Sequence, residues 1–381
     1  MRPQRLKYPL LPFSQLVYDS TRWMPQEYML CMSFRVMDGA SKMELWRKAV
    51  SAALLNHPVF SMHVDWRGMQ TPNPTENILD GQFHRVSFRE DGKDLIIQGR
   101  INRILGDGTS LAILLEDIHR AYRGESLPLD DYWNYLEYVE QQKQSHHYQE
   151  SKAWLEQEFG DRTVPVRPKS DSKLWSLRPP KAGIYTEDYS PSHVDIIQFA
   201  KAQKLTMEGF FSLCAALAIA EYNGTDSAAL TWAYMGRERE EERRIFGSLH
   251  RDIPFYIKVK GERLKVKGEL IREAGNQIRQ GIAHSDYPYT LTKPYNKRWN
   301  YAVNVLRVEN QGELIKLLPG KVELLPTPPS QYAYALLDVE IHESFNQLNL
   351  VFRYSASHYK ESSIHRFAAL MRKYAEWLLE K

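Results

Sequence analysis

The segment INRILGDGTS, residues 101–110, carries the side chains of this sequence that could do chemistry. Arg103 and Asp107 stand four residues apart, and Gly108 and Ser110 follow the aspartate. An arginine cannot serve as a general base, because its guanidinium stays protonated at physiological pH. It can donate hydrogen bonds to a carbonyl or a developing oxyanion, or bind a carboxylate or phosphate through two parallel contacts. The segment therefore predicts anchoring or electrophilic chemistry at Arg103 rather than proton abstraction.

A strand and a helix are expected to position these side chains. Residues 94–105 (DLIIQGRINRIL) alternate with the period of a strand, so Arg103 shares the face of the apolar residues if the strand runs unbroken. Thr109 or Ser110 is expected to cap a helix whose apolar stripe extends to Tyr122. Arg103 is then predicted to point inward, toward a core or a cavity.

The rest of the chain alternates helices and strands in two halves, which predicts an α/β fold. A long helical stretch is expected at residues 133–159, and a proline-rich segment without periodicity follows it. We predict an N-terminal lobe at residues 1–165, a linker at 166–183 and a C-terminal lobe at 184–381. The second lobe should hold a buried helix at residues 207–223, several strands and a closing amphipathic helix.

Composition narrows the function classes. The 381 residues carry a net charge of only +3, from 50 basic and 47 acidic side chains, so nucleic acid and anionic membranes are not expected partners. Cys31 and Cys214 fit no metal-ligand spacing, and no phosphate-loop, dinucleotide or zinc-protease motif occurs. The basic N-terminus lacks the apolar region of a signal peptide, so we expect a cytoplasmic, soluble monomer without a bound metal.

The order of these features resembles the condensation domains of nonribosomal peptide synthetases, members of the chloramphenicol-acetyltransferase-like superfamily. The resemblance is carried by segments in the family's order: YPLLPFSQ, LWRKAVSAALLNHPVFSMHV, GDGTSLAILLEDIHRAYRGESLPL, YWNYLEYVEQQ, MGREREEERRIFGSLHRDIPFYIKV and the closing strands and helix. The third of these matches the second half of the family's signature, H-H-x-x-x-D-G-x-S. The resemblance extends over nearly the whole chain.

The resemblance implies two pseudo-symmetric lobes in a pseudo-dimeric V with a central tunnel. Phosphopantetheine or coenzyme A thioesters would enter this tunnel as substrates, with no bound cofactor, and the partners would be an acyl or peptidyl carrier protein or a tailoring enzyme. The implied structural salt bridge joins Asp107 to Arg237, and Gly108 would supply a backbone conformation or a close approach that a β-carbon would block. The residues expected to line the tunnel are Asn102, Gly108, Ser110, His250 and Arg251.

The sequence departs from the family at the positions that matter most. The two signature histidines fall on Asn102 and Arg103, and an asparagine of the second lobe falls on Arg251. Arg103 could pair with an acid in a site that has lost its chemistry, bind a ligand without base catalysis, or orient an acyl transfer whose amine is activated elsewhere. His250 could face the tunnel or could be an ordinary residue at a strand edge.

Three functions stay open on these grounds. The first is an atypical or inactive condensation domain of nonribosomal peptide assembly that engages carrier-bound thioesters or partner proteins. The second is an active acyltransferase that forms an amide or ester from an acyl-carrier or acyl-CoA thioester. The third is a small-molecule binder that keeps only the tunnel. Elsewhere, the alternating charges of residues 237–244 predict a solvated surface, and His57 is expected to end a helix.

Overall fold

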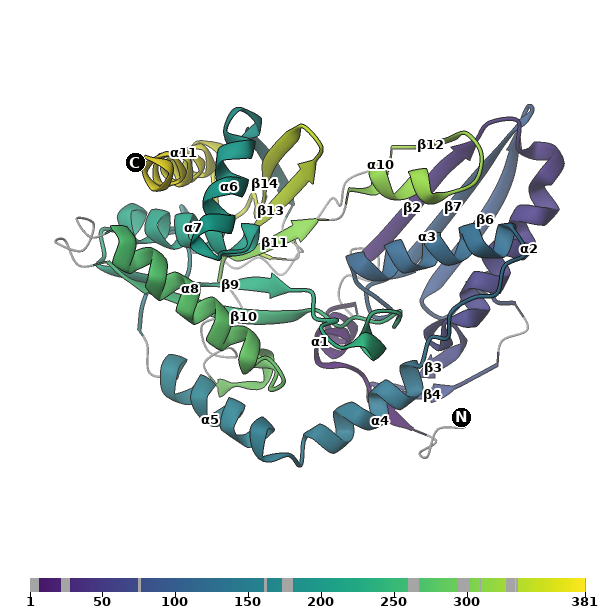
Figure 1. Cartoon of the computed structure of the whole chain (residues 1–381), viewed down its shortest axis with the longest axis horizontal. Coiled ribbons are helices and arrows are strands. Elements are labelled where there is room, and N and C mark those ends of the chain that lie inside the picture. The colour runs from purple at the N-terminus through teal and green to yellow at the C-terminus, as the bar shows by residue number, and fades with distance from the viewer. Residues whose placement is uncertain are drawn as a thin grey trace. The chain divides into compact units, whose positions relative to one another are not determined.

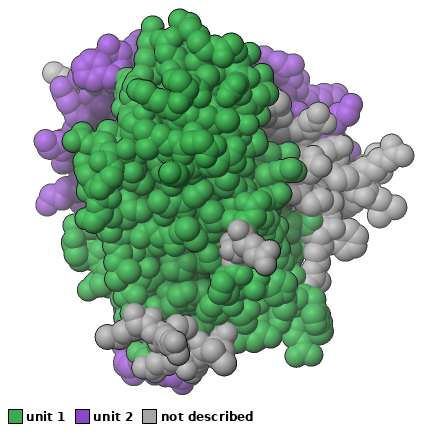
Figure 2. All heavy atoms as spheres, turned by 90° about the vertical axis from the view of Figure 1, so that its right-hand side faces the viewer, with its two compact units in different colours: residues 1–142, 235–250, 309–329 green, residues 143–234, 251–308, 330–381 purple. Residues whose placement is uncertain are grey.

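The structure is a computed structural model in which residues 7–21, 28–74, 77–160, 163–172, 181–259, 267–293, 302–308, 310–326, 333 and 335–380 are described. The chain forms two compact units, coloured separately in Figure 2. Unit 1 comprises Met1–Gln142, Met235–His250 and Glu309–Pro329, and unit 2 comprises Lys143–Tyr234, Arg251–Val308 and Ser330–Lys381.

Unit 1 is built around a five-stranded antiparallel sheet in the order β12-β2-β7-β6-β5, with a separate three-stranded sheet β1-β4-β3 (Figure 1). Its strands are β1 (Tyr8–Pro9), β2 (Met29–Val36), β3 (Met62–Val64), β4 (Met69–Pro72), β5 (Asp80–Gly81), β6 (His84–Asp91), β7 (Asp94–Asn102) and β12 (Val322–Leu324). Its α-helices are α1 (Pro12–Thr21), α2 (Met43–Asn56), α3 (Gly108–Tyr122), α4 (Tyr132–Gln142) and the short α10 (Gln311–Leu314).

The core of unit 1 follows from the alternation of its strands. Every second residue of β2 and β7 is apolar and buried, and α2 and α3 pack their apolar stripes against one another and against this face. The remaining face of β2 carries the polar residues Ser33 and Arg35. The motif segment therefore emerges at the end of a well-buried strand and leads directly into a well-buried helix.

Two stretches from the second half of the chain belong to unit 1. The segment Met235–His250 is inserted between two paired strands of unit 2. The segment Glu309–Pro329 supplies β12, in which Val322–Leu324 pairs antiparallel with Val36–Phe34 of β2. The predicted lobes were contiguous, with the boundary at residues 166–183. The first boundary between the compact units lies at residue 143, and unit 1 also includes these two later segments, which we call the exchanged segments. The physical reason is that strand pairing and ion pairing depend on partners far away in sequence, which no local pattern encodes.

Unit 2 contains a six-stranded sheet in the order β10-β9-β11-β13-β14-β8, antiparallel except that β11 runs parallel to both β9 and β13. Its strands are β8 (Ala182–Asp188), β9 (Ser227–Tyr234), β10 (Arg251–Lys258), β11 (Asn304–Val308), β13 (Leu337–Ser344) and β14 (Gln347–Ser355). Its α-helices are α5 (His146–Phe159), α6 (His193–Gln203), α7 (Met207–Asn223), α8 (Lys267–Ala283) and α11 (Glu361–Leu379).

The helix α7 is the centre of the core of unit 2. Its residues from Gly209 to Ala220 are all buried, and it packs against α11, α8 and β9. Thr206 caps its N-terminus and Gly224, in the left-handed conformation, ends it. The sequence predicted this helix with the same bounds.

The helix predicted over residues 133–159 is broken. It forms α4 and α5, and Ser145 begins the second of them by accepting the backbone N–H of Tyr148 at 3.1 Å. The break coincides with the change from unit 1 to unit 2. Among the described helices, none alone has the length and apolar composition to cross a bilayer, and only the bent pair Ser190–Gln203 and Met207–Asn223 meets that test jointly.

Candidate functional site

The motif aspartate is the N-cap of α3. The carboxylate of Asp107 accepts the backbone N–H of Ser110 at 3.0 Å, and the hydroxyl of Ser110 accepts the backbone N–H of Asp107 at 3.2 Å. This reciprocal pair satisfies donors that the first turn of a helix leaves unbonded. The prediction that Thr109 or Ser110 is the cap was wrong, because the aspartate before them fills this position and Ser110 is its partner within the first turn.

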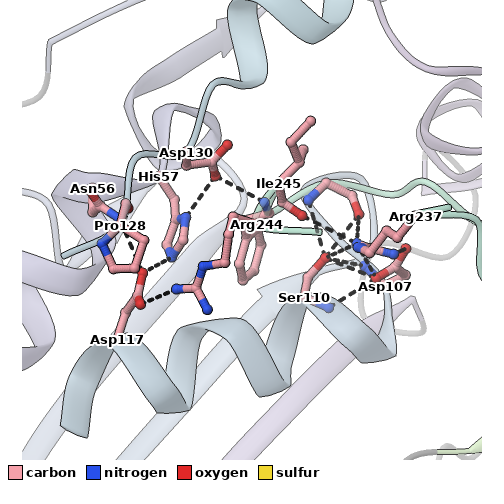
Figure 3. A network of polar contacts seen from close by, with 12 residues as sticks. Asn56, His57, Asp107, Ser110, Asp117, Pro128, Asp130, Arg237, Arg244 and Ile245 are labelled. Atoms are coloured by element: carbon pink, nitrogen blue, oxygen red, sulfur yellow. Dashed lines mark hydrogen bonds and ion pairs between the residues drawn. The ribbon is translucent and has the colours of Figure 1, made fainter. Parts of the chain in front are cut away.

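Arg237 pairs with Asp107 through two parallel bonds, as Figure 3 shows. Nη1 donates to Oδ2 and Nη2 donates to Oδ1, both at 2.9 Å. The two side chains are only 6% and 4% exposed, so neither charge is solvated. Burial alone would raise the pKa of Asp107, but the charge and hydrogen bonds of Arg237 outweigh it and hold the pKa below its usual value. The pair therefore remains ionised. We refer to this buried ion pair as the Asp107–Arg237 joint.

The joint fastens the inserted segment Met235–His250 to α3. Nη2 of Arg237 also donates to the carbonyl of Gly247 at 3.0 Å, and Leu249 donates its N–H to Oδ2 of Asp107 at 3.0 Å. Arg237 itself lies in the left-handed region, with φ of 65°, which costs an L-residue about 1–2 kcal/mol. The buried ion pair holds the backbone in that conformation.

Ser110 and Gly108 lie in this scaffold. Ser110 is fully buried, and its hydroxyl contacts Asp107, Arg237 and the backbone of Gly247. Gly108 is the first residue of α3. At Gly106, two residues before it, a β-carbon would come within 2.7 Å of Cε1 of Phe246.

Arg103 lies outside the strand that was expected to carry it. The strand β7 ends at Asn102, whose side-chain oxygen accepts the N–H of Ile104 at 2.9 Å and starts a turn over residues 103–105. The inward direction was predicted for an unbroken strand, and the alternation of β7 stops one residue before Arg103. Arg103 is half-buried, and no carboxylate within the described ranges forms an ion pair with it.

Asn102 is buried, so its polar groups serve the fold. Its backbone N–H donates to the carbonyl of Phe83 at 2.8 Å, in addition to the side-chain bond that starts the turn. Asn102 also borders a pocket of about 380 Å³ in unit 1, together with His84 and Arg100. Asn102 is thus a residue that ends a strand and begins the turn before the motif aspartate.

His250 and Arg251 are neighbours in sequence but belong to different units. Arg251 lies in unit 2, where Nη1 donates to Oγ of Ser285 at 2.8 Å and lies 3.4 Å from Oδ1 of Asp286. His250 lies in unit 1, close enough to the motif for the charges of Asp107, Arg103 and Arg237 to act on its imidazole. His250 precedes β10 and is not part of that strand.

A second buried network, which the sequence did not predict, lies beside the motif. His57 is fully buried, with Nδ1 2.7 Å from Oδ2 of Asp130 and Nε2 3.2 Å from Oδ2 of Asp117 (Figure 3). Arg244 pairs with Asp117 and lies 2.7 Å from Oε2 of Glu116. His57 ends a helix as expected, since it is the C-cap of α2, but its two acidic partners come from distant positions that no local pattern indicates.

The charge state of this network follows from its contacts. Burial alone would lower the pKa of His57, but its bonds to Asp117 and Asp130 outweigh burial and raise the pKa. The prediction of a solvated surface at residues 237–244 holds for Glu238, Glu240, Glu241 and Arg243, which are exposed. It was wrong for Arg237 and Glu242, which are buried, and Arg244 joins the network. In the parts of the chain that the structure describes, no three His, Cys, Asp or Glu side chains gather as metal ligands.

Solved structures share the fold of the whole chain. The epimerization domain from the third module of tyrocidine synthetase B matches with a TM-score of 0.77 and 15% identity, covering 100% of this chain and 98% of the other. The cyclization-docking bidomain of EpoB from Sorangium cellulosum gives 0.78 and 14%, covering 100% and 87%. The X-domain from teicoplanin biosynthesis gives 0.78 and 14%, covering 100% and 95%. These likenesses confirm the predicted chloramphenicol-acetyltransferase-like fold.

The sequence itself matches one family. A comparison with curated proteins finds no match, whereas the family model described as "Condensation domain" matches residues 103–381. The matched region begins at Arg103 and includes the Asp107–Arg237 joint and the inserted segment. The chain therefore belongs to the condensation-domain family.

Proposed function

We propose that this protein is an atypical condensation domain of nonribosomal peptide assembly that binds acyl thioesters on a carrier protein or on coenzyme A. The observation that carries the proposal is the state of Arg103. By the resemblance to the family, this side chain falls on the second histidine position of the signature; it is half-buried and has no acid partner among the described residues. The supporting scaffold is meanwhile held together by hydrogen bonds from Arg237 to both carboxylate oxygens of Asp107 and to the hydroxyl of Ser110.

Arg103 has the chemistry to hold a thioester. Its guanidinium presents several N–H donors in a plane and remains charged at any physiological pH, so it can donate to the thioester carbonyl oxygen. A hydrogen bond from a charged donor contributes about 1.5–3 kcal/mol, roughly twice a neutral one. Because the guanidinium cannot accept a proton, its proposed role is to bind and polarise the carbonyl and not to activate the nucleophile.

A binding measurement tests this role. The probe is an acyl-pantetheine analogue in which an amide replaces the thioester, titrated calorimetrically into wild type, Arg103→Ala and Arg103→Lys. We expect Arg103→Ala to weaken the affinity by about 10–100-fold, the equivalent of one charge-assisted hydrogen bond. The control is Arg123→Ala, since Arg123 is an exposed arginine of the same unit whose partner is Glu125. Equal affinity of wild type and Arg103→Ala would contradict the proposal.

A docking or gating module without chemistry is the second candidate. It is favoured by the replacement of both signature histidines, Asn102 being a strand-ending residue and Arg103 a permanent cation. A turnover assay with acyl-carrier and acyl-CoA donors and a panel of amines separates the two. Product from wild type but not from Arg103→Ala would exclude the module without chemistry, whereas activity only in Arg103→His would mark a site that has lost its reaction.

A further inference from the structure

One histidine of unit 1 lies within electrostatic reach of Arg103. His250 is the last residue of the inserted segment Met235–His250, and the charge of Arg103 acts on its ring. Its neighbour Leu249 donates a backbone N–H to Oδ2 of Asp107 at 3.0 Å. The ring of His250 contacts the ring of Phe13 in α1, with centroids 3.5 Å apart. His250 is thus held beside the motif by a backbone bond and a ring contact.

The imidazole of His250 is neutral at physiological pH. Burial lowers the pKa of His250 to about 4; the charge of Asp107 opposes this shift, and the charges of Arg103 and Arg237 reinforce it. Across the described residues, neither ring nitrogen forms a hydrogen bond. A neutral imidazole has one nitrogen with an available lone pair, which can accept a hydrogen bond or a proton.

The nearby histidine of the second network does not have this freedom. His57 is fully buried, and both of its ring nitrogens face carboxylates, at 2.7 and 3.2 Å. Its raised pKa also favours the protonated form, which has no lone pair to offer. Of these two histidines, His250 is therefore the one that is unprotonated and has no hydrogen-bond partner among the described residues.

Given the thioester binding proposed above, we propose that His250 accepts the proton of the attacking amine or alcohol while Arg103 donates hydrogen bonds to the thioester carbonyl. The two residues would divide the work of the missing signature histidine: His250 moves the proton, and Arg103 stabilises the oxyanion. The chemical class of the acceptor is a primary amine or an alcohol, and the class of the donor is an acyl thioester.

The step balances without any further reactant. The amine nitrogen attacks the carbonyl carbon, the new C–N bond forms, and the carbonyl electron pair moves to the oxygen beside Arg103. The nitrogen, now positively charged, releases its proton to His250. The C–S bond then breaks, and the departing sulfur takes that proton from the imidazolium, leaving an amide and a free thiol. A weak base is sufficient here, because the nitrogen becomes strongly acidic once the C–N bond has formed, and orientation supplies much of the rate.

The test compares wild type with His250→Gln and His250→Ala in the turnover assay, using an alcohol as the acceptor, because an alcohol does not ionise in this pH range and cannot hide the ionisation of the enzyme. We expect both variants to lose about 100-fold or more in kcat, the usual contribution of a proton-transfer group, with unchanged affinity for the amide analogue. In wild type the rate should be constant from about pH 6 to 8 and fall as the pH approaches 4, the direction set by protonation of His250. The control is His146→Gln, which alters an exposed histidine of unit 2.

Each outcome separates this inference from the proposed function. Analogue binding with turnover that His250→Gln leaves intact would overturn the role of His250 and leave thioester binding standing. Binding without turnover by wild type for every acceptor would do the same. Failure of wild type to bind the analogue would instead overturn the proposed function. Should both variants unfold, the wild-type pH profile still decides, because a rate that falls near pH 6–7 requires a different base.

Discussion

Asp107 uses one carboxylate for two structural tasks. It caps α3 through the N–H of Ser110, and it neutralises Arg237 through two bonds of 2.9 Å. A buried charge of either sign is costly unless it is paired and hydrogen-bonded, and here each atom of the carboxylate accepts more than one donor. Asp107 thus belongs to the scaffold, and the chemistry is left to neighbours that are not committed to it.

Replacement of Asp107 by asparagine should cost stability. The amide keeps the size of the side chain but leaves the charge of Arg237 buried and unpaired, so we expect Asp107→Asn to lower the free energy of unfolding by about 3–5 kcal/mol at pH 7. Urea unfolding followed by circular dichroism measures this change. The exposed pair of Lys316 and Glu313 supplies the control, since Glu313→Gln should change stability by less than about 1 kcal/mol. Equal effects of the two variants would contradict a structural role for Asp107.

At the residue scale, the sequence predicted which residues interact better than it predicted where a strand ends. The motif aspartate and the arginine considered as its partner are both visible in the sequence, and the structure joins them. The strand was predicted to continue past Arg103, but the side chain of Asn102 ends it one residue earlier, and the alternation of apolar residues does not indicate this end. The role proposed for His250 depends on Phe13 and on charges more than 100 residues away, which no local pattern contains.

At the scale of elements, His57 connects parts of unit 1 that are distant in sequence. It follows α2, its partner Asp117 lies in α3, and its partner Asp130 precedes α4. Asp130 also accepts the N–H of Phe246 at 2.9 Å, which adds the inserted segment. A protonated His57 between two carboxylates therefore stabilises the packing of α2 and α3 against one another.

The stability of unit 1 should depend on the charge of His57. Since the folded state raises the pKa of His57, its contribution is complete below the unfolded value near 6.5 and is lost as the pH rises through the folded value. We expect His57→Gln to lower the free energy of unfolding by about 3 kcal/mol at pH 6, and by less at pH 9. Urea unfolding at the two pH values measures the difference. His146→Gln is the matched exposed control, and an effect of His57→Gln that does not change with pH would argue against the charged form.

Element boundaries were harder to predict than element types. In α2, Trp46 is buried whereas its neighbour Leu45 is 43% exposed, although both side chains are apolar. The helix starts at Met43 after a turn of 3-10 helix over Ala40–Lys42. Alternating charges at residues 237–244 are typical of a solvated surface, and only their acidic partners Asp107 and Asp117 show why Arg237 is buried and Arg244 is drawn into an ion pair.

At the scale of the whole molecule, the units do not coincide with halves of the chain. Unit 1 needs Met235–His250 to complete the Asp107 joint and Glu309–Pro329 to add β12 beside β2. The α/β class and the chloramphenicol-acetyltransferase-like fold were predictable because they depend on the order of elements. The inclusion of the exchanged segments in unit 1 was not predictable, because each of these segments is stabilised by partners that lie 100 or more residues earlier in the sequence.

A fragment of residues 1–142 should therefore not fold as the intact unit does. It lacks Arg237, which pairs with Asp107, and Arg244, which pairs with Asp117. It also lacks the edge strand β12. We expect its free energy of unfolding to be at least about 3 kcal/mol below that of unit 1 in the full chain, with a broad urea transition. Circular dichroism and tryptophan fluorescence in urea measure this. A sharp transition at the midpoint of the full chain would show that the exchanged segments are dispensable.

The 130 residues between Asp107 and Arg237 also have a consequence during synthesis. A ribosome adds about 5–20 residues per second, so the nascent chain exposes the unpaired aspartate for roughly 6–26 s before its partner is made. The edge of β2 remains unpaired for longer still, because its partner strand β12 begins only at Val322. An open strand edge on a nascent chain is a template for pairing with other chains. Chaperone contacts during translation are therefore expected to concentrate on the β2 edge, until the last exchanged segment has left the ribosome.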